Sequence, residues 1–186
     1  VKATFDWEGF EHEISAIDAS KYQPDSLMIP YILTLKKYFV KGGDNHSFYF
    51  GPKATTRFKT GSSSLKLPDI SLLEENVAII KVPGIISFNK DDIQRYADTL
   101  RRQIAVIDKS ENIRGWIVDL RHNSGGSMWP MLAGLNPLLD DGTVGYFIDP
   151  NNKLTPWELS EKKQLGVGKL EVIYKCKDRT KKIAVL

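Results

Sequence analysis

A run of polar and glycine residues follows a short apolar segment near the middle of the chain. Residues 115–120 have the composition of a buried strand, and residues 121–126 read Arg-His-Asn-Ser-Gly-Gly. A strand that ends at paired glycines and continues into a helix leaves backbone N–H groups free to point at one spot. Such groups stabilise a developing negative charge, so Gly125 and Gly126 are candidate donors of an oxyanion hole. Spacing alone leaves two alternatives open, because similar turns bind phosphates or only reverse the chain.

A histidine in a second polar turn offers a base. His46 lies within residues 42–48, Gly-Gly-Asp-Asn-His-Ser-Phe, after an apolar helical pattern. Neutral imidazole takes a proton from a serine hydroxyl and returns it to a leaving amine. The alternative is a histidine that only caps the turn.

Both segments resemble one known family. Residues 119–139 resemble the signature loop and helix of the tail-specific (C-terminal processing) serine peptidases, in particular their bacterial branch without a PDZ domain, which is related to the tricorn core protease. Residues 42–48 resemble the Asp-x-His-Ser/Thr element that supplies the base in the tricorn-like members. The resemblance implies that His46 is the general base and that a loop glycine donates its N–H to the oxyanion. His122 stands where most members have a small residue.

The resemblance also implies where the nucleophile lies. In this family the catalytic serine follows the strand after the signature helix, so we expect the serine and the acid that orients the base to lie beyond Leu186. The chain alone is then inactive. The serines at 62–64 and Ser124 are not set in the Gly-x-Ser-x-Gly elbow that exposes a nucleophile. Cys176 has cationic neighbours, but its apolar, strand-like surroundings predict a buried side chain.

Two further side chains of the glycine loop are candidate substrate-binding groups, Arg121 and Ser124. Simpler roles compete with this interpretation. Asp119 and Arg121 can fix the end of the strand through hydrogen bonds or an ion pair. Ser124 can satisfy the backbone of the loop.

Composition excludes several classes of function. The chain has 186 residues, of which 41% are hydrophobic and 26% charged, as in an ordinary globular protein. Its net charge of +3 is small and dispersed, so nucleic-acid binding is not indicated. No apolar run approaches the ~20 residues of a membrane span. The three histidines do not have the spacing of a zinc site, and the Walker and dinucleotide patterns are missing, so no metal or cofactor is predicted.

Hydrophobic periodicity divides the chain into two parts. Residues 1–52 are predicted to form a helical cap subdomain that carries the His46 loop, with Asp6 capping one helix and Gly42 ending another. Residues 53–186 form an α/β peptidase core, with residues 53–68 as a connector or hairpin. The remaining predicted elements are strands at 77–82, 116–120, 143–148, 169–175 and 183–186 and helices at 91–108 and 128–139.

The fold class is therefore α/β with a small N-terminal helical subdomain, and the resemblance implies a ClpP/crotonase-like βαβ core that is incomplete at its C-terminal end. The expected function is that of a serine peptidase acting on peptides or proteins, in an extracytoplasmic location of a bacterium. The alternative is a non-catalytic pseudopeptidase that only binds peptides. The sequence does not indicate an oligomeric state.

Overall fold

The chain divides into two compact units, Val1–Ala54 and Thr55–Leu186, which are described here one at a time. The computed structural model describes residues 5–24, 26–44, 47, 49–60, 65–160, 166–178 and 180–186. His46 and the serines at 62–64 lie outside the described residues.

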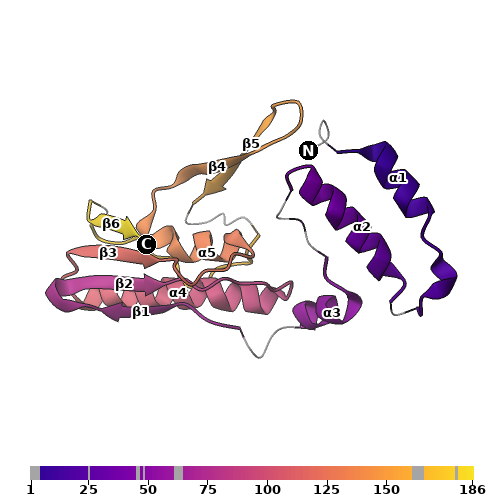
Figure 1. The fold of residues 1–186 in the computed structure, drawn as a ribbon. Helices are drawn as coiled ribbons and strands as arrows, with labels where there is room; N and C mark the ends of the chain where they lie inside the picture. The colour runs from indigo at the N-terminus through magenta and orange to yellow at the C-terminus, as the bar shows by residue number, and fades with distance from the viewer. Residues whose placement is uncertain are drawn as a thin grey trace. The chain divides into compact units, whose positions relative to one another are not determined.

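The N-terminal unit is helical, as predicted (Figure 1). Asp6 caps the first helix because its carboxylate accepts a hydrogen bond from the backbone N–H of Gly9 at 3.0 Å. Gly42 ends the third helical element, and Gly43 follows in the left-handed region with φ 84°. The helices are α1 (Trp7–Ser15), the short 3₁₀ helix η1 (Ala19–Lys21) and α2 (Met28–Lys41).

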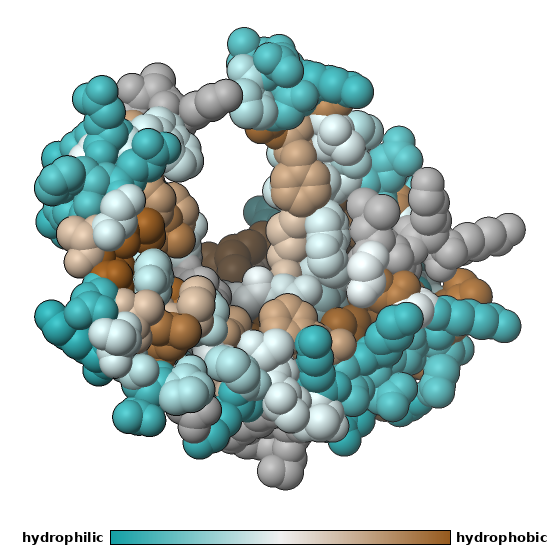
Figure 2. Space-filling view, turned by 90° about the vertical axis from the view of Figure 1, so that its right-hand side faces the viewer, coloured by the Kyte–Doolittle hydropathy of each residue, from teal (hydrophilic) through white to brown (hydrophobic). Residues whose placement is uncertain are grey.

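Aromatic side chains form the small core between α1 and α2. Phe5 packs edge-on against Phe10 and Phe39 and at a tilt against Tyr38, with ring centroids 5.5 to 5.9 Å apart. The Tyr38 hydroxyl donates to Glu13 at 2.9 Å, which ties α2 to α1. Some large apolar side chains stay exposed, and Figure 2 shows such brown atoms reaching the surface among the teal, hydrophilic ones.

The second unit is built on a four-stranded sheet in the order β1-β2-β3-β6. Strands β2, β3 and β6 run parallel, and β1 pairs with β2 in the antiparallel sense. The helix α4 connects β2 to β3, which confirms the predicted βαβ unit (Figure 1). The elements are β1 (Asp69–Leu72), η2 (Glu74–Asn76), β2 (Val77–Lys81), α4 (Lys90–Ser110), β3 (Gly115–Asp119), α5 (Met128–Leu135), η3 (Asn136–Leu138) and β6 (Lys182–Val185).

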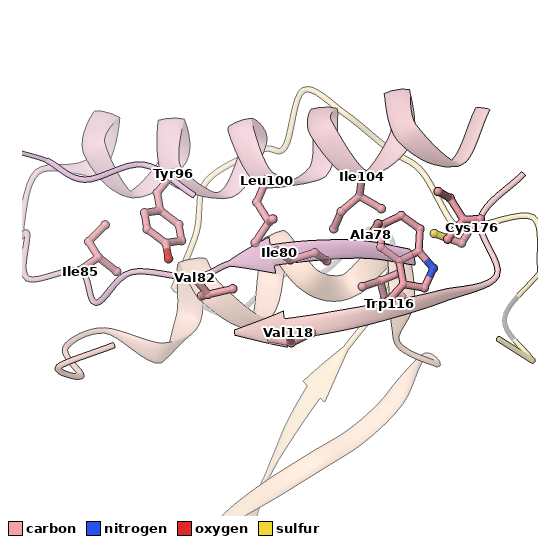
Figure 3. Close-up of a cluster of buried hydrophobic side chains, with 12 residues drawn as sticks. Ala78, Ile80, Val82, Ile85, Tyr96, Leu100, Ile104, Trp116, Val118 and Cys176 are labelled. Carbon is pink, nitrogen blue, oxygen red and sulfur yellow. The ribbon is translucent and has the colours of Figure 1, made fainter. Parts of the chain in front are cut away.

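The core of this unit lies between α4 and one face of the sheet (Figure 3). Tyr96, Leu100 and Ile104 follow each other at the four-residue spacing of one helix face and are fully buried. They pack over alternate residues of β2 and β3, among them Ile80 and Trp116. The mixed α/β fold with preceding helices is thus as predicted.

In the first part of this region one prediction was wrong and one strand was not predicted. The segment expected as a connector or hairpin, residues 53–68, contains the helix α3 (Pro52–Thr60). Pro52 occupies its first position, where proline's missing N–H costs nothing. Strand β1 was not predicted, because its four residues form a strand only through pairing with β2.

A second sheet contains only two strands, β4 (Gly142–Ile148) and β5 (Leu154–Leu159), and this hairpin projects from the four-stranded sheet (Figure 1). The strand predicted at 143–148 is confirmed, whereas β5 was not among the predicted strands. Trp157 stabilises the pairing, since its ring covers Gly145, where an added Cβ would lie 2.4 Å from the ring. The indole also packs edge-on against Trp129 of α5.

The strand predicted at residues 169–175 is not present, because side chains of α4 bind this segment in place of a neighbouring strand. The Asp98 carboxylate accepts from the N–H of Glu171 at 3.0 Å. The Arg101 guanidinium donates to the carbonyl oxygen of Val172 at 2.5 Å. Arg101 is fully buried, which is unusual for a charged side chain.

Candidate active site

The candidate site lies where the parallel strands β2 and β3 end, the edge of an α/β sheet at which ligands commonly bind. Residues 120–127 follow β3 and carry the paired glycines, and residues 82–86 follow β2. A parallel bridge between Ile85 and Gly126 joins the two segments. The N–H of Ser127 also donates to the carbonyl oxygen of Ile85 at 2.8 Å.

Glycine is required at Gly126 for two independent reasons. Its backbone has φ 113°, a region that L side chains rarely adopt, and an added Cβ would lie 2.0 Å from the carbonyl oxygen of Ile85. Gly84 makes a similar approach, since its Cβ would lie 2.5 Å from the carbonyl oxygen of Gly125. The two segments therefore pack backbone against backbone.

Asn123 organises the loop, and sequence reasoning did not single it out. Its amide nitrogen donates to the carbonyl oxygen of Val82 at 3.0 Å, and its amide oxygen accepts from the N–H of Gly125 at 2.8 Å. The same nitrogen lies 3.3 Å from the sulfur of Met131. An asparagine two residues before a glycine is a known turn signal, so the sequence did contain a clue to the role of Asn123.

The two candidate oxyanion donors differ in the structure. The N–H of Gly125 is engaged by the side chain of Asn123. The N–H of Gly126 makes no hydrogen bond within the described part of the chain, and Gly126 is exposed. Of the two, only Gly126 has a donor free to receive a developing charge.

Asp119 and Arg121 fix the end of β3, as predicted. The guanidinium donates to the carboxylate through Nε at 2.9 Å and Nη2 at 2.8 Å, and the backbone N–H of Arg121 donates to the same carboxylate at 3.1 Å. Asp119 is buried and Arg121 is exposed. The hydroxyl of Ser124 makes no hydrogen bond with a described residue, so Asn123 takes the role expected of Ser124.

The turn that carries the predicted base is braced by Asp44. Its carboxylate accepts from the backbone N–H of Ser47 at 3.0 Å and from the Ser47 hydroxyl at 2.6 Å. His46, between these two residues in the sequence, lies outside the described residues, so its role stays a prediction.

Cys176 is buried, with 5% of its surface exposed, and burial raises the pKa of its thiol to about 12. It is therefore an inert core residue, as predicted, although it does not lie in a strand. Among the described residues no three His, Cys, Asp or Glu side chains gather where they could hold a metal ion.

The sequence profile described as Peptidase family S41 matches residues 76–186, which include the whole glycine loop and the strands that position it. The chain belongs to this peptidase family. The match confirms that the loop and helix resemble those of this peptidase family. Enzymes of a peptidase family act on peptides or proteins.

Two further proteins are similar to this chain. The chain is 37% identical over 87 residues to the nisin-resistance protein of Lactococcus lactis subsp. lactis. The aligned residues make up 47% of this chain and 26% of that protein. A solved lipoprotein from Streptococcus agalactiae has a similar fold, with a TM-score of 0.62 and 20% identity over 82% of this chain and 49% of that one. The chain thus spans about a quarter and about half of these two relatives. Within the described residues no helix of the peptidase chain is both long and apolar enough to cross a membrane.

Asn123→Ala is expected to loosen the glycine loop, because it leaves the carbonyl oxygen of Val82 and the N–H of Gly125 without their partner. The free energy of unfolding should fall by about 1–3 kcal/mol, the usual cost of such unpaired groups. Urea unfolding followed by tryptophan fluorescence measures it. Ser124→Ala, the matched change one residue later, should alter the stability by less than about 0.5 kcal/mol. Equal effects of the two variants would contradict the role assigned to Asn123.

Asp119 should make folding sensitive to acid. The Arg121 side-chain and backbone hydrogen bonds lower the pKa of this carboxyl from 3.8 to about 2. A lowered folded-state pKa stabilises the fold above the unfolded pKa, so this contribution is complete above pH 3.8 and is lost as the pH falls toward 2. Asp119→Asn should flatten the stability profile in that window, as measured by thermal unfolding at a series of pH values. An unchanged slope would show that the ion pair contributes nothing.

Proposed function

We propose that this chain supplies the general base and the oxyanion donor of a serine peptidase that cleaves peptides or proteins. The proposed enzyme is tail-specific, so it prefers sites close to the C terminus of its substrate. The single observation that carries the proposal concerns Gly126, an exposed residue of the family-matched loop whose N–H makes no hydrogen bond with a described residue and whose packing only glycine permits. Gly125 contributes to the shape of the loop, since its own N–H is engaged.

In the proposed reaction a serine hydroxyl attacks the scissile carbonyl carbon while His46 accepts the hydroxyl proton. The carbonyl oxygen becomes an oxyanion, and the N–H of Gly126 donates to it. His46 then returns the proton to the departing amine. In the second step His46 accepts a proton from a water molecule that attacks the acyl-enzyme, and the N–H of Gly126 again donates to the oxyanion. Asp44 and Ser47, which flank His46 in the sequence, are bonded to each other through the Asp44 carboxylate.

We propose that the serine comes from outside these 186 residues. Ser124 follows Asn123 in the glycine turn, without the Gly-x-Ser-x-Gly pattern of the elbow that exposes a nucleophile. The serines at 62–64 lie in a low-complexity sequence with the same deficiency. On this proposal the chain alone does not hydrolyse peptides, and the acid that orients His46 also lies elsewhere.

Arg121 and Ser124 are proposed to contact the substrate backbone. Arg121 uses Nε and Nη2 for Asp119, so Nη1 is left to donate to a substrate carbonyl. Ser124 is exposed with an uncommitted hydroxyl. Both side chains lie on the same loop as the proposed oxyanion donor.

An extracytoplasmic location in a bacterium is proposed from the relatives, one printed as a lipoprotein and the other as a nisin-resistance protein. A lipoprotein is held at a membrane surface by its lipid, and such a place would suit the hydrolysis of external peptides.

The test is labelling of the full-length natural protein with a fluorophosphonate probe, followed by mass mapping of the modified residue. We expect an adduct on a serine outside residues 1–186 that disappears with His46→Ala. His12→Ala is the matched control, because His12 is an exposed residue of α1. An unlabelled but folded protein would reject the peptidase and favour the pseudopeptidase that only binds peptides.

A further inference from the structure

We propose that Tyr96 is a positioning residue of the peptidase, because its hydroxyl holds the backbone that sets the place of the Gly126 N–H. This inference rests on the proposed function, in which Gly126 donates to the oxyanion. Tyr96 is fully buried on α4, so it reaches neither the substrate nor the reacting atoms. It acts through residues 82–86, part of the segment that connects β2 to α4 and packs against the glycine loop.

The position of Gly126 follows that of Ile85. The two residues form a parallel bridge, and the N–H of the next residue, Ser127, donates to the carbonyl oxygen of Ile85 at 2.8 Å. A Cβ on Gly126 would lie 2.0 Å from the same oxygen, so the two backbones are in direct contact. A displacement of Ile85 therefore also displaces the N–H that is proposed to donate to the oxyanion.

Helix α4 holds this segment on both sides of Ile85. Two residues before it, the carbonyl oxygen of Pro83 accepts a hydrogen bond from the Tyr96 hydroxyl at 2.6 Å. Two residues after it, the Ser87 hydroxyl donates to the Asp92 carboxylate at 2.9 Å. Figure 3 shows the ring of Tyr96 extending from α4 toward the segment that carries Ile85. Ile85 is thus placed between two anchors on one helix.

Other contacts of the segment come from the glycine loop. Asn123 donates to the carbonyl oxygen of Val82 at 3.0 Å, and Gly126 and Ser127 meet Ile85. Such contacts join the segment to the loop, whereas the hydrogen bonds from α4 join both of them to the core. Loss of a bond from α4 is therefore expected to let the segment and the loop shift together.

The chemistry of tyrosine suits this role. Pro83 has no N–H, so its carbonyl oxygen is the backbone group through which a hydrogen bond can hold it. The ring of Tyr96 belongs to the buried cluster between α4 and the sheet, which fixes the place of the hydroxyl. Burial raises the pKa of this hydroxyl, so it stays protonated and donates at neutral and mildly alkaline pH. Phenylalanine would fill the same space without burying a polar group, so packing alone does not account for the hydroxyl.

Tyr96→Phe removes the hydroxyl and keeps the ring. Complete loss of an oxyanion donor costs about 10²–10³ in rate, and a displaced donor should cost less. We expect the maximal rate of fluorophosphonate labelling, kinact, to fall about tenfold. The half-saturating probe concentration, KI, should stay within about twofold of the wild-type value, because the donor acts on charge that develops only during the reaction.

The measurement uses the full-length natural protein, with Tyr174→Phe as the matched control. The Tyr174 hydroxyl donates to Asp108 at 2.7 Å, in the last turn of α4, so its removal costs a comparable hydrogen bond at the opposite end of the helix. Urea unfolding sets conditions under which both variants are folded. Hydrogen–deuterium exchange of the peptide that contains Ser127 is followed in parallel, because this N–H exchanges when its bond to Ile85 opens.

Slower labelling together with faster exchange of the Ser127 peptide, in Tyr96→Phe and not in Tyr174→Phe, would support the proposal. Equal labelling rates or equal exchange in the two variants would overturn it. A folded wild-type protein that is not labelled would overturn the peptidase proposal itself, and the role of Tyr96 would fall with it. If Tyr96→Phe does not fold, Ser87→Ala removes the second anchor and should lower kinact in the same way, and an unchanged kinact would then refute the positioning role of the α4 contacts.

Discussion

Gly126→Ala is expected to lower the free energy of unfolding by about 3 kcal/mol. An L side chain in a left-handed backbone conformation costs roughly 1–2 kcal/mol, and the disruption of a buried hydrogen bond costs roughly 1–2 kcal/mol more. The added Cβ would lie 2.0 Å from the carbonyl oxygen of Ile85, which is backbone and cannot turn away. Separating the two segments breaks the 2.8 Å hydrogen bond from Ser127 to Ile85. Urea unfolding followed by tryptophan fluorescence measures the loss, because Trp116 is buried in the core of this unit.

Gly125→Ala is the matched control. Its φ of 90° also disfavours an L side chain, but nothing lies within 4 Å of the added Cβ. We therefore expect only the backbone cost, about 1–2 kcal/mol. If both variants unfold at the same urea concentration, the close approach to Ile85 does not limit this loop. If the peptidase proposal is right, Gly126→Ala should also reduce fluorophosphonate labelling more strongly than Gly125→Ala.

Arg101→Met is expected to destabilise the second unit by at least about 2 kcal/mol. Two buried acceptors and one partly buried acceptor lose their donor, and each unpaired group costs roughly 1–3 kcal/mol, partly offset because a cation is no longer buried. The guanidinium donates to the carbonyl oxygen of Ala133 at 2.9 Å, to the side-chain oxygen of Asn136 at 3.2 Å, and to Val172. Ala133 lies in the last turn of α5, where a cation also favours the helix dipole. The measurement is again urea unfolding.

Arg102→Met is the control for this change, since it replaces the same residue type at the next position of α4. Arg102 has 58% of its side chain exposed and pairs at 3.0 Å with Glu171, which has 69% exposed. Such surface pairs contribute less than about 1 kcal/mol. Arg101→Lys should not restore stability, because an ammonium group cannot span acceptors from three segments. A tolerated Arg101→Met would show that α5 and the segment after it hold their places without this residue.

Local signals in the sequence were sufficient for much of the fold. The Asp6 cap and the Gly42 stop depend on hydrogen bonds within a few residues, so the helical boundaries of the N-terminal unit could be predicted. The alternation in β2 and the four-residue spacing in α4 likewise reflect burial on one face, which sequence periodicity reports directly. Elements stabilised by distant partners could not be predicted this way: β1 and β5 depend on their neighbouring strands.

The candidate site divides along the same line. The sequence by itself determined the loop, its paired glycines and the peptidase family, because these are contiguous residues with a shared pattern. Only the tertiary structure decided that Asn123 occupies the N–H of Gly125 and leaves that of Gly126 free. It also decided that Arg101 is buried and that residues 169–175 are not a strand. Asn123 contacts Gly125 locally, but the distant carbonyl oxygen of Val82 holds its amide in place. The contacts of Arg101 and of residues 169–175 join segments that the packing of α4 and the sheet brings together, and no pattern of neighbouring residues encodes them.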